Sequence, residues 1–168
     1  MSTGRVLIVS DTHGYAEGFK TVFARESAEG LDMVLHAGDL DGGEVKLRNL
    51  VGLTPMLMVR GNNDYGTTLP AEQIFRLGGR MVLLTHGHRD HVNMGTEFIA
   101  QKALERGADV VIFGHTHEPL IEERGGVLLL NPGSVTYPRQ MEPRASYILL
   151  HIKGDGAWEP EIRYVKES

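Results

Sequence analysis

The sequence predicts an α/β fold formed by a single domain that spans residues 1–168. In the first half, short apolar runs of strand character alternate with segments of helical periodicity, a pattern typical of a parallel sheet. In the second half, pairs of apolar runs are separated by glycine-containing turns, which indicates hairpins. Polar residues of metal-binding types follow five of the predicted strands, and α/β sheets carry their ligands at such strand ends.

The first half predicts a strand, helix, strand, helix and strand, at residues 5–10, 16–29, 33–36, 44–50 and 56–59. The first helix is predicted because Phe19, Val22 and Phe23 follow helical spacing. Gly30 then provides a C-terminal stop. This order implies parallel pairing, so the carboxyl ends of the three strands should meet at one edge of a sheet.

The second half predicts strands at residues 73–77, 80–85, 110–113, 120–123, 127–130, 146–152 and 161–165. Gly78-Gly79 and Gly125-Gly126 predict two hairpin turns, and Gly154-Asp155-Gly156 predicts a turn between the last two strands. One helix is predicted at residues 93–106. Its expected apolar face consists of Met94, Phe98, Ala103 and Leu104.

Composition excludes several classes of function. The 17 basic and 22 acidic residues give a formal charge of −5, whereas extended nucleic-acid binding needs a basic surface. Because the chain has no cysteine, disulfides, thiolate metal sites and thiol catalysis are excluded. The apolar runs are too short for a signal-peptide core or a membrane span. We therefore expect a cytoplasmic protein that does not act on a membrane, and formation of a homo-oligomer is left open.

Seven residues of metal-ligand type lie in five clusters, each directly after a predicted strand: Asp11, His13, Asp39, Asn62, His86, His115 and His117. In extended backbone, side chains two residues apart point to the same side, so Asp11 and His13 could meet one ion. His115 and His117 repeat this spacing. Each motif alone could be a turn or a cap, but five in order predict a metal site. The oxygen and nitrogen donors suit manganese, iron or zinc better than calcium.

The ordered motifs resemble those of the calcineurin-like metallophosphoesterase superfamily: Asp-x-His, Gly-Asp, Gly-Asn-x-Asp, Thr-His-Gly-His and Gly-His-Thr-His. The segment Leu130-Asn131-Pro132-Gly133-Ser134-Val135, followed by Pro138-Arg139, is similar to that of its small single-domain bacterial and archaeal phosphodiesterases. The resemblance extends from about Val6 to Arg139. It implies a four-layer α/β/β/α sandwich of two mixed β-sheets, with the metal site at the C-terminal strand ends.

The resemblance also implies two divalent metal ions that share Asp39. The first would be held by Asp11, His13, Asp39 and His117, and the second by Asp39, Asn62, His86 and His115. Manganese is the expected metal, with iron, zinc and nickel as alternatives. The implied activity is hydrolysis of a small phosphodiester by a metal-bridging hydroxide.

Two alternative functions remain at this stage. The first is a phosphomonoesterase or a nuclease that acts on short ends. The second is a non-catalytic protein-binding scaffold, similar to the retromer subunit of the same superfamily. All seven ligand positions are filled, which favours an enzyme.

The chain departs from larger members of the superfamily at one position. Many of them carry histidine after the metal-binding asparagine, whereas this chain has Asn63, whose amide can donate a hydrogen bond but cannot titrate. His88, two residues beyond His86, is the nearest substitute. His88 and Asn63 are therefore the candidate catalytic residues, and we expect a preference for activated diesters over alkyl monoesters.

Several neighbouring residues are expected to support the site. His36 should be packed beside it, and Asp64 should orient a loop or a ligand. The segment Asn131–Ser134 is expected to shape the pocket wall. Arg60 and Arg139 could meet phosphate, but solvated side chains are the favoured interpretation for both.

Overall fold

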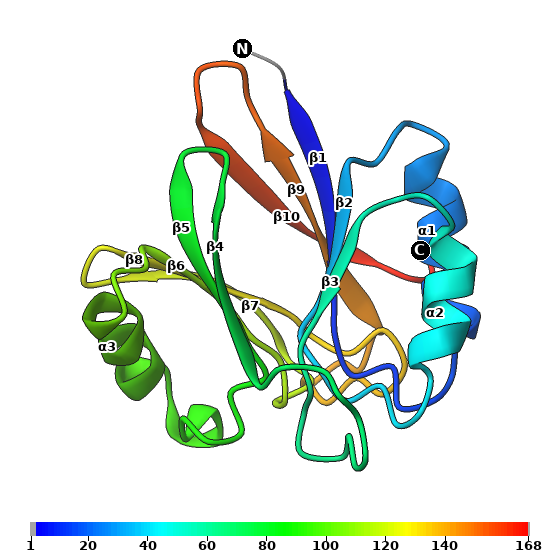
Figure 1. Cartoon of the computed structure of the whole chain (residues 1–168), viewed down its shortest axis with the longest axis horizontal. Helices are drawn as coiled ribbons and strands as arrows, with labels where there is room; N and C mark the ends of the chain where they lie inside the picture. Colours follow the sequence, from blue (N-terminus) through cyan, green and yellow to red (C-terminus); the bar gives the residue numbers. More distant parts are fainter. Residues whose placement is uncertain (1–2, 168) are drawn as a thin grey trace.

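Residues 3–167 are described by the computed structural model, and they form two five-stranded sheets that pack face to face (Figure 1). The first sheet has the order β10-β9-β1-β2-β3. Its strands are β1 (Gly4–Val9), β2 (Met33–His36), β3 (Met56–Met58), β9 (Ser146–Ile152) and β10 (Trp158–Tyr164). β1, β2 and β3 are parallel to one another, while β9 runs antiparallel to β1 and to β10.

The second sheet has the order β4-β5-β6-β8-β7. Its strands are β4 (Glu72–Leu77), β5 (Arg80–Thr85), β6 (Val110–Ile112), β7 (Pro119–Arg124) and β8 (Val127–Pro132). β5, β6 and β8 are parallel, and the outer strands β4 and β7 are added by antiparallel hairpins. Both sheets are therefore mixed, as expected.

Three hydrophobic clusters mark the three interfaces between four layers. Residues of both sheets form the central cluster. Helices α1 (Glu17–Ser27) and α2 (Glu44–Val51) pack on the outer face of the first sheet and form the second cluster with it. Helix α3 (Glu97–Glu105) covers the second sheet and forms the third cluster. The predicted α/β/β/α sandwich is confirmed.

Strand β1 shows why its residues form a central strand. Val6 and Ile8 belong to the cluster between the sheets, whereas Leu7 and Val9 belong to the cluster beneath the helices. Successive side chains of a strand point to opposite faces, so a run that is apolar at every position suits a strand buried on both faces. All four side chains are at most 2% exposed.

The predicted helix at residues 93–106 is wrong at its amino end. A short 3₁₀ helix, η1 (Val92–Met94), comes first, and α3 begins only at Glu97. Met94, Phe98 and Leu104 are exposed, and the buried face consists of Ile99, Ala100 and Ala103. Gly95, with φ 130° and ψ −178°, separates the two segments because this conformation is open to glycine and interrupts a helix.

Among residues 3–167, no helix has both the length and the apolar character needed to cross a membrane. The loops after β1, β2, β3 and β5 gather at the bottom of Figure 1, which is the carboxyl end of these strands. The same sheet edges carry the seven candidate ligands.

Candidate metal centre

The seven candidate ligands lie on five loops that follow parallel strands. Asp11 and His13 follow β1, Asp39 follows β2 and Asn62 follows β3. His86 comes directly after β5, while His115 and His117 follow β6. Backbone hydrogen bonds join the first two loops, because Asp11 N–H donates to the Gly38 carbonyl (2.9 Å) and His13 N–H to the Asp39 carbonyl (3.0 Å). The packing of the two sheets thus brings together residues as far apart in the chain as Asp11 and His115, which are 104 positions apart.

The first group contains Asp11, His13 and His117, whose potential ligand atoms all lie within 4.8 Å of one another. Asp11 Oδ1 is 3.2 Å from His117 Nε2 and 3.6 Å from His13 Nε2. The two imidazole Nε2 atoms are 3.2 Å apart.

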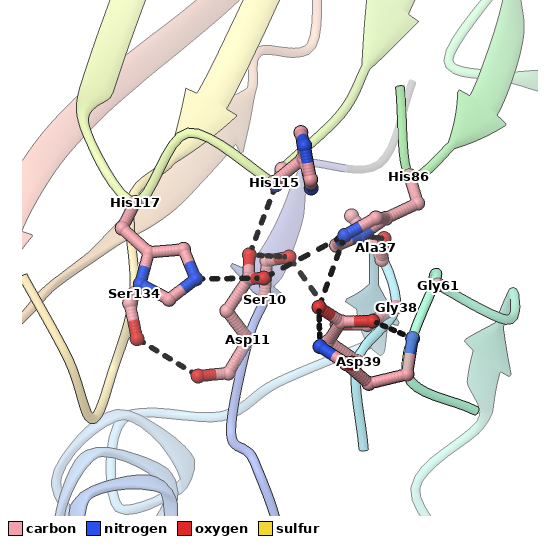
Figure 2. Close-up of polar contacts among 12 residues, drawn as sticks. Ser10, Asp11, Ala37, Gly38, Asp39, Gly61, His86, His115, His117 and Ser134 are labelled. Atoms are coloured by element: carbon pink, nitrogen blue, oxygen red, sulfur yellow. Dashed lines mark hydrogen bonds and ion pairs between the residues drawn. The ribbon is translucent and has the colours of Figure 1, made fainter. Parts of the chain in front are cut away.

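The second group contains Asp39, His86 and His115, which satisfy the same distance limit. Asp39 Oδ2 lies 3.3 Å from His86 Nε2 and 3.8 Å from His13 Nε2, so this carboxylate contacts both groups. Figure 2 shows His117 and His86 on opposite sides of Asp11, with Asp39 beside His86. The two groups contain six of the seven predicted ligands, divided as the two predicted sets divide them, and Asn62 is in neither group.

Three of the imidazole rings are oriented through Nδ1. His86 Nδ1 lies 2.7 Å from the Ala37 carbonyl, His117 Nδ1 lies 2.6 Å from the Tyr137 carbonyl, and His13 Nδ1 lies 2.9 Å from Asp41 Oδ2. Because these oxygens can only accept hydrogen bonds, each Nδ1 carries a hydrogen, which leaves Nε2 as the nitrogen that can bind a metal ion once it is deprotonated. The three Nε2 atoms converge on the two carboxylates, which is the arrangement of imidazoles prepared to bind metal.

The donor atoms fit divalent cations, because two of them are buried without a hydrogen-bond partner. Four buried side-chain polar atoms in residues 3–167 lack such a partner, and they include Asp11 Oδ1 and His86 Nε2, which are 3.7 Å apart. Both side chains are 0% exposed. Leaving a buried polar group unpaired is costly, so these atoms indicate a ligand that the protein atoms do not supply.

The electrostatics of the site keep both carboxylates ionised. Burial by itself would raise the pKa of Asp11, but the nearby imidazoles of His117 and His13 hold it well below its usual range. At Asp39, burial raises the pKa and the imidazole of His86, 3.3 Å away, lowers it, and the net effect lowers the pKa. The adjacent carboxylate of Asp11 raises the pKa of His13 to about 9. A bound metal ion would replace the proton that His13 carries beside these carboxylates.

The backbone at the ligands is left-handed, which corrects the expectation of extended backbone at Asp11 and His13. Seven non-glycine residues within 3–167 have positive φ, and five of them are candidate ligands: Asp11, His13, Asp39, His115 and His117, with φ between 50° and 72°. This conformation is uncommon for residues other than glycine and costs free energy. The tight turns, rather than an extended strand, bring the i and i+2 side chains together.

Two glycines that precede ligands are required by close approach. A Cβ at Gly61 would overlap the Asp39 carboxylate, and a Cβ at Gly114 would overlap Ser10 and lie 2.7 Å from Asp11 Oδ2. The bare backbone at Gly114 lets His115 N–H donate to Asp11 Oδ2 (3.1 Å). These positions explain why the motifs begin with glycine.

In the loop after β3, the residue that contacts the Asp39 carboxylate is Asn63 and not the predicted ligand Asn62. Asn62 is exposed, and within residues 3–167 no hydrogen bond links its side chain to the other candidate ligands. Asn63 instead donates to Asp39 through both its backbone N–H (2.9 Å) and its side-chain Nδ2 (3.1 Å). The ligand role of Asn62 stays a prediction.

Asp64 and His36 support the ligands from behind. Asp64 accepts four backbone N–H hydrogen bonds of 2.7–2.8 Å, from Gly61, Asp39, Leu40 and Asp41. It therefore ties the loop after β2 to the loop after β3, as expected. His36 is fully buried, its Nδ1 accepts from Gly38 N–H (3.0 Å), and its Nε2 is 3.1 Å from Thr12 Oγ1.

His88 lies next to the second group. Its ring centroid is 5.5 Å from that of His86 and 6.2 Å from that of His115. Its Nδ1 is buried without a partner, and burial lowers its pKa. On the other side, Asn93 Nδ2 is 3.1 Å from His115 Nε2, a contact that sequence reasoning did not anticipate.

An open cleft of ≈ 820 Å³ reaches the first group. It is lined by His13, Tyr15, Asp41, His117, Tyr137, Pro138, Arg139 and Pro143. The segment Asn131–Ser134, which was expected to shape the pocket wall, is buried and does not itself line this cleft. Asn131 Nδ2 instead donates to the Gly114 carbonyl (3.2 Å), and Ser134 Oγ donates to the Asp11 carbonyl (2.8 Å). Sequence reasoning expected the loop that begins at Asp41 to line the pocket, and Asp41 does line this cleft, but it missed Tyr15 and Tyr137, which belong to no motif.

Comparison with known proteins places the chain among phosphoesterases. A family model described as "Calcineurin-like phosphoesterase superfamily domain" matches residues 5–155. A probable metallophosphoesterase of Bacillus subtilis is 37% identical, over 90% of this chain and 86% of the relative. The phosphodiesterase YfcE of Escherichia coli is 29% identical, over 87% of this chain and 86% of the relative.

Solved structures show the same fold. A predicted phosphoesterase of Streptococcus pneumoniae superposes with a TM-score of 0.83 at 26% identity, covering 98% of this chain and 91% of that one. Vps29 of Entamoeba histolytica in complex with Zn²⁺ superposes with a TM-score of 0.76 at 26% identity, covering 96% and 99%.

Proposed function

The chain belongs to the calcineurin-like phosphoesterase superfamily, and from this premise we propose that it is a phosphodiesterase that depends on two divalent cations. Membership of a metallophosphoesterase family implies divalent metal ions, and the two groups of donor atoms around Asp39 are where they would bind. The observation that carries the proposal is the pair of buried, unpartnered atoms, Asp11 Oδ1 and His86 Nε2, on the two sides of the site.

In this proposal Asp11, His13, His117 and Asp39 hold one cation, and Asp39, Asn62, His86 and His115 hold the other. When bound, such cations act as Lewis acids, lower the pKa of water and stabilise the charge on the phosphoryl group. Manganese is the proposed native metal, since carboxylate, amide and imidazole donors together suit it.

The protein's own groups orient these ligands. Asp41 holds the imidazole of His13 through Nδ1, and the Ala37 and Tyr137 carbonyls do the same for His86 and His117. Asn63 donates to both oxygens of Asp39, so its amide fixes the shared carboxylate instead of protonating a leaving group. We assign Asn63 to positioning for this reason.

His88 is the proposed hydrogen-bond donor to the leaving-group oxygen. Burial and the neighbouring His86 lower its pKa, so the imidazole is neutral at pH 7. A neutral imidazole N–H can donate a hydrogen bond to the leaving-group oxygen, but it is only a weak acid. General acid catalysis typically contributes about 10²–10⁴-fold, and weak assistance of this kind suits leaving groups that depart readily. The proposed substrates are activated phosphodiesters in preference to alkyl monoesters.

The test is to load the metal-stripped protein with Mn²⁺ and compare hydrolysis of bis(4-nitrophenyl) phosphate with release of phosphate from an alkyl monoester. We expect two bound metal ions per chain, turnover of the diester, and loss of turnover on chelation. Full activity in a thoroughly stripped sample would contradict the metal mechanism. A faster rate on the alkyl monoester would favour a phosphomonoesterase.

The structural likeness to Vps29 gives the second candidate, a non-catalytic protein-binding scaffold. Because Vps29 of Entamoeba histolytica is also found complexed with Zn²⁺, metal binding by itself would not separate the two functions, and the decisive measurement is turnover. A sample with two bound metals and no hydrolysis of any phosphate ester would favour the scaffold.

A further inference from the structure

The cleft beside the first metal group has an aromatic wall that the metal chemistry does not explain. His13 and His117 line this cleft together with Tyr15 and Tyr137. The rings of Tyr15 and Tyr137 meet edge to face, with centroids 5.8 Å apart and an interplanar angle of 83°. The Tyr137 ring is also 5.8 Å from the ring of His13, so the aromatic wall begins directly at the candidate ligands.

Tyr137 is exposed although its backbone is held firmly. Its carbonyl accepts from His117 Nδ1 (2.6 Å), and its N–H donates to Ser134 Oγ (2.7 Å). The side chain of Tyr137 is nevertheless 46% exposed, and that of Tyr15 is 59% exposed. A rigid backbone with an exposed ring is a preorganised contact surface, since binding there orders little that is not already ordered.

The remaining lining of the cleft suits a flat, partly polar group. Pro138 and Pro143 add apolar surface beside the tyrosines. Arg139 lines the same cleft, and within residues 3–167 no ion pair or side-chain hydrogen bond engages its guanidinium. Its backbone N–H donates to the His117 carbonyl (3.1 Å), which fixes the point from which the side chain extends. A planar guanidinium can contact a phosphate oxygen and can stack on an aromatic ring.

A second hollow continues from this cleft, since the two share Tyr15, Tyr137, Pro138 and Pro143. An ester group bound at the tyrosines is therefore not confined to the size of a methyl group. Exposed aromatic rings in a cleft with a cation are the means by which proteins bind ring systems without reading them through hydrogen bonds.

We propose that Tyr15 and Tyr137 form a stacking platform for an aromatic or heteroaromatic ring on one ester group of the phosphodiester substrate. This inference rests on the proposed phosphodiesterase function and adds the class of substrate: diesters with a ring-bearing ester group, as opposed to short alkyl or glycerol diesters. Tyr15 and Tyr137 are specificity-determining residues in this assignment, and the metal ligands hold the phosphate.

The experiment measures binding of three inert, monoanionic analogues of a diester by calorimetry on the Mn²⁺-loaded protein. The analogues are methyl(phenyl)phosphinate, methyl(cyclohexyl)phosphinate and dimethylphosphinate, whose carbon–phosphorus bonds cannot be hydrolysed. Stacking on an aromatic side chain contributes about 1–3 kcal/mol per base. We therefore expect the phenyl compound to bind about 5–150-fold more tightly than the dimethyl compound. The cyclohexyl compound, which has a similar size but no π face, should bind between them.

Four variants locate the effect. Tyr137→Ala and Tyr15→Ala should each lose most of the phenyl preference and keep the affinity for dimethylphosphinate. Tyr137→Phe keeps the ring and should keep the preference. Phe98→Ala removes an exposed aromatic ring that lines a different hollow, on α3, and should change nothing. Metal content is measured for every variant. Tyr15→Ala does not alter Tyr137, whose carbonyl orients His117.

Equal affinities for the phenyl and dimethyl compounds in the unaltered protein would overturn the inference, as would binding of neither compound. Equal affinities for the phenyl and cyclohexyl compounds would overturn the aromatic part, as would a preference that survives both alanine variants. Because no analogue is hydrolysed, these outcomes are separate from the test of function. A protein that prefers the phenyl compound but hydrolyses no ester would sink the phosphodiesterase proposal and leave the platform standing.

Discussion

Strand β1 lies between two buried charged clusters, only one of which is fully paired by protein groups. Beyond its carboxyl end lies the metal centre, and at its amino end lies the Glu26 cluster, which consists of Arg5, Arg25, Glu26, Tyr147 and Arg163. Both contain a carboxylate that is almost completely buried, since Glu26 is 1% and Asp11 0% exposed. They differ in whether the protein itself satisfies that charge.

In the Glu26 cluster every carboxylate oxygen has protein partners. Glu26 Oε1 accepts from Arg5 Nη2 (3.0 Å) and Arg163 Nη1 (3.0 Å). Oε2 accepts from the Tyr147 hydroxyl (2.7 Å) and Arg163 Nη1 (2.9 Å). Burial would raise the pKa of Glu26, but these partners lower it. Burial and the adjacent Glu26 raise the pKa of Tyr147 to about 12.

In the metal centre the acids face imidazoles and each other, and two buried atoms have no partner. Five of the candidate ligands also carry left-handed backbone, whereas none of the Glu26 cluster does. A buried charge that is fully paired supports the fold. Buried polar atoms without a partner, next to turns with strained backbone, indicate a site for a ligand. The contrast separates a structural cluster from a functional one without reference to any relative.

The largest expected effect is loss of activity on substitution of the shared carboxylate. Asp39→Asn keeps the shape but removes the charge that contacts both groups, so activity should fall by more than the roughly 10–100-fold that loss of an outer-shell partner costs. Bound Mn²⁺ should fall below two ions per chain. Hydrolysis of bis(4-nitrophenyl) phosphate and metal analysis measure both. A variant with near-normal turnover would remove Asp39 from the centre.

The second prediction concerns stability at the other end of β1. Glu26→Ala leaves Arg5 and Arg163 without their buried partner, and breaking such a pair costs about 3 kcal/mol, the lower end of the usual range because both arginines are partly exposed. Turnover per folded molecule should be unchanged. Urea unfolding of the metal-stripped protein provides the free energy of unfolding.

Glu161→Ala is the matched control, because Glu161 also pairs with Arg163 (3.0 Å) but is 56% exposed. A surface pair contributes about 0–1 kcal/mol. If the two variants lost the same free energy of unfolding, burial would not distinguish them, and the comparison between the clusters would fail. If Asp39→Asn destabilised the metal-stripped protein more than Glu26→Ala, the metal centre would be the structural cluster.

The third prediction uses pH. Burial lowers the pKa of His36 to about 4, against an ordinary value of 6.5. The unfolded chain therefore binds a proton that the folded chain refuses between these values, so stability falls as the pH drops from 6.5 to 4. Protonation of His36 accounts for a total loss of about 3 kcal/mol in the free energy of unfolding over this pH range. Because Nδ1 accepts from Gly38 N–H, protonation would also break that hydrogen bond.

Unfolding of the metal-stripped protein at a series of pH values between 4 and 7 tests this prediction against His36→Gln. The glutamine keeps an acceptor and a donor but does not titrate, so its pH dependence in this window should be flatter. Parallel curves for the two proteins would contradict the assignment to His36.

Much of the fold was predictable because its signals are local. The alternation of apolar runs, the paired glycines and the helical spacing in 16–29 each report on a few neighbouring residues, and the corresponding β1, α1 and hairpins formed as expected. The helix at 93–106 was misplaced because Met94 and Phe98 are apolar by composition but exposed in the structure. Periodicity indicates which residues could be buried, and tertiary packing decides which are.

The sequence predicted which residues gather at the strand ends, apart from Asn62, but it did not predict their geometry. Glycine followed by a carboxylate or histidine after a strand is visible in sequence, so the members of both groups were found. The left-handed turns at Asp11 and His13 are not visible in the sequence. The φ angles there depend on backbone hydrogen bonds to Gly38 and Asp39, in a loop about 26 residues away. The Glu26 cluster was also missed, since Glu26 and Arg163 are 137 residues apart and neither belongs to a motif.

The smallest predicted effect concerns Asp64, which resembles Glu26 in being fully paired but serves the metal centre. Its two oxygens accept four backbone N–H groups from the loops that carry Asp39 and Asn62. In Asp64→Asn, one acceptor becomes an NH₂ that faces N–H donors, so two of these bonds are lost and the loops separate. We expect turnover and Mn²⁺ affinity to fall about 10–100-fold, as for other groups that orient metal ligands.

Asp155→Asn is the control for this last change, because Asp155 also accepts a backbone N–H, from Ala157 (3.0 Å), in the turn between β9 and β10. The same chemical change there should leave turnover and Mn²⁺ affinity unaltered. If Asp64→Asn lost stability without losing Mn²⁺ affinity, Asp64 would belong with Glu26 among the structural groups. A loss of Mn²⁺ affinity at unchanged stability would show that a fully paired carboxylate can still be functional when the backbone it holds carries the ligands.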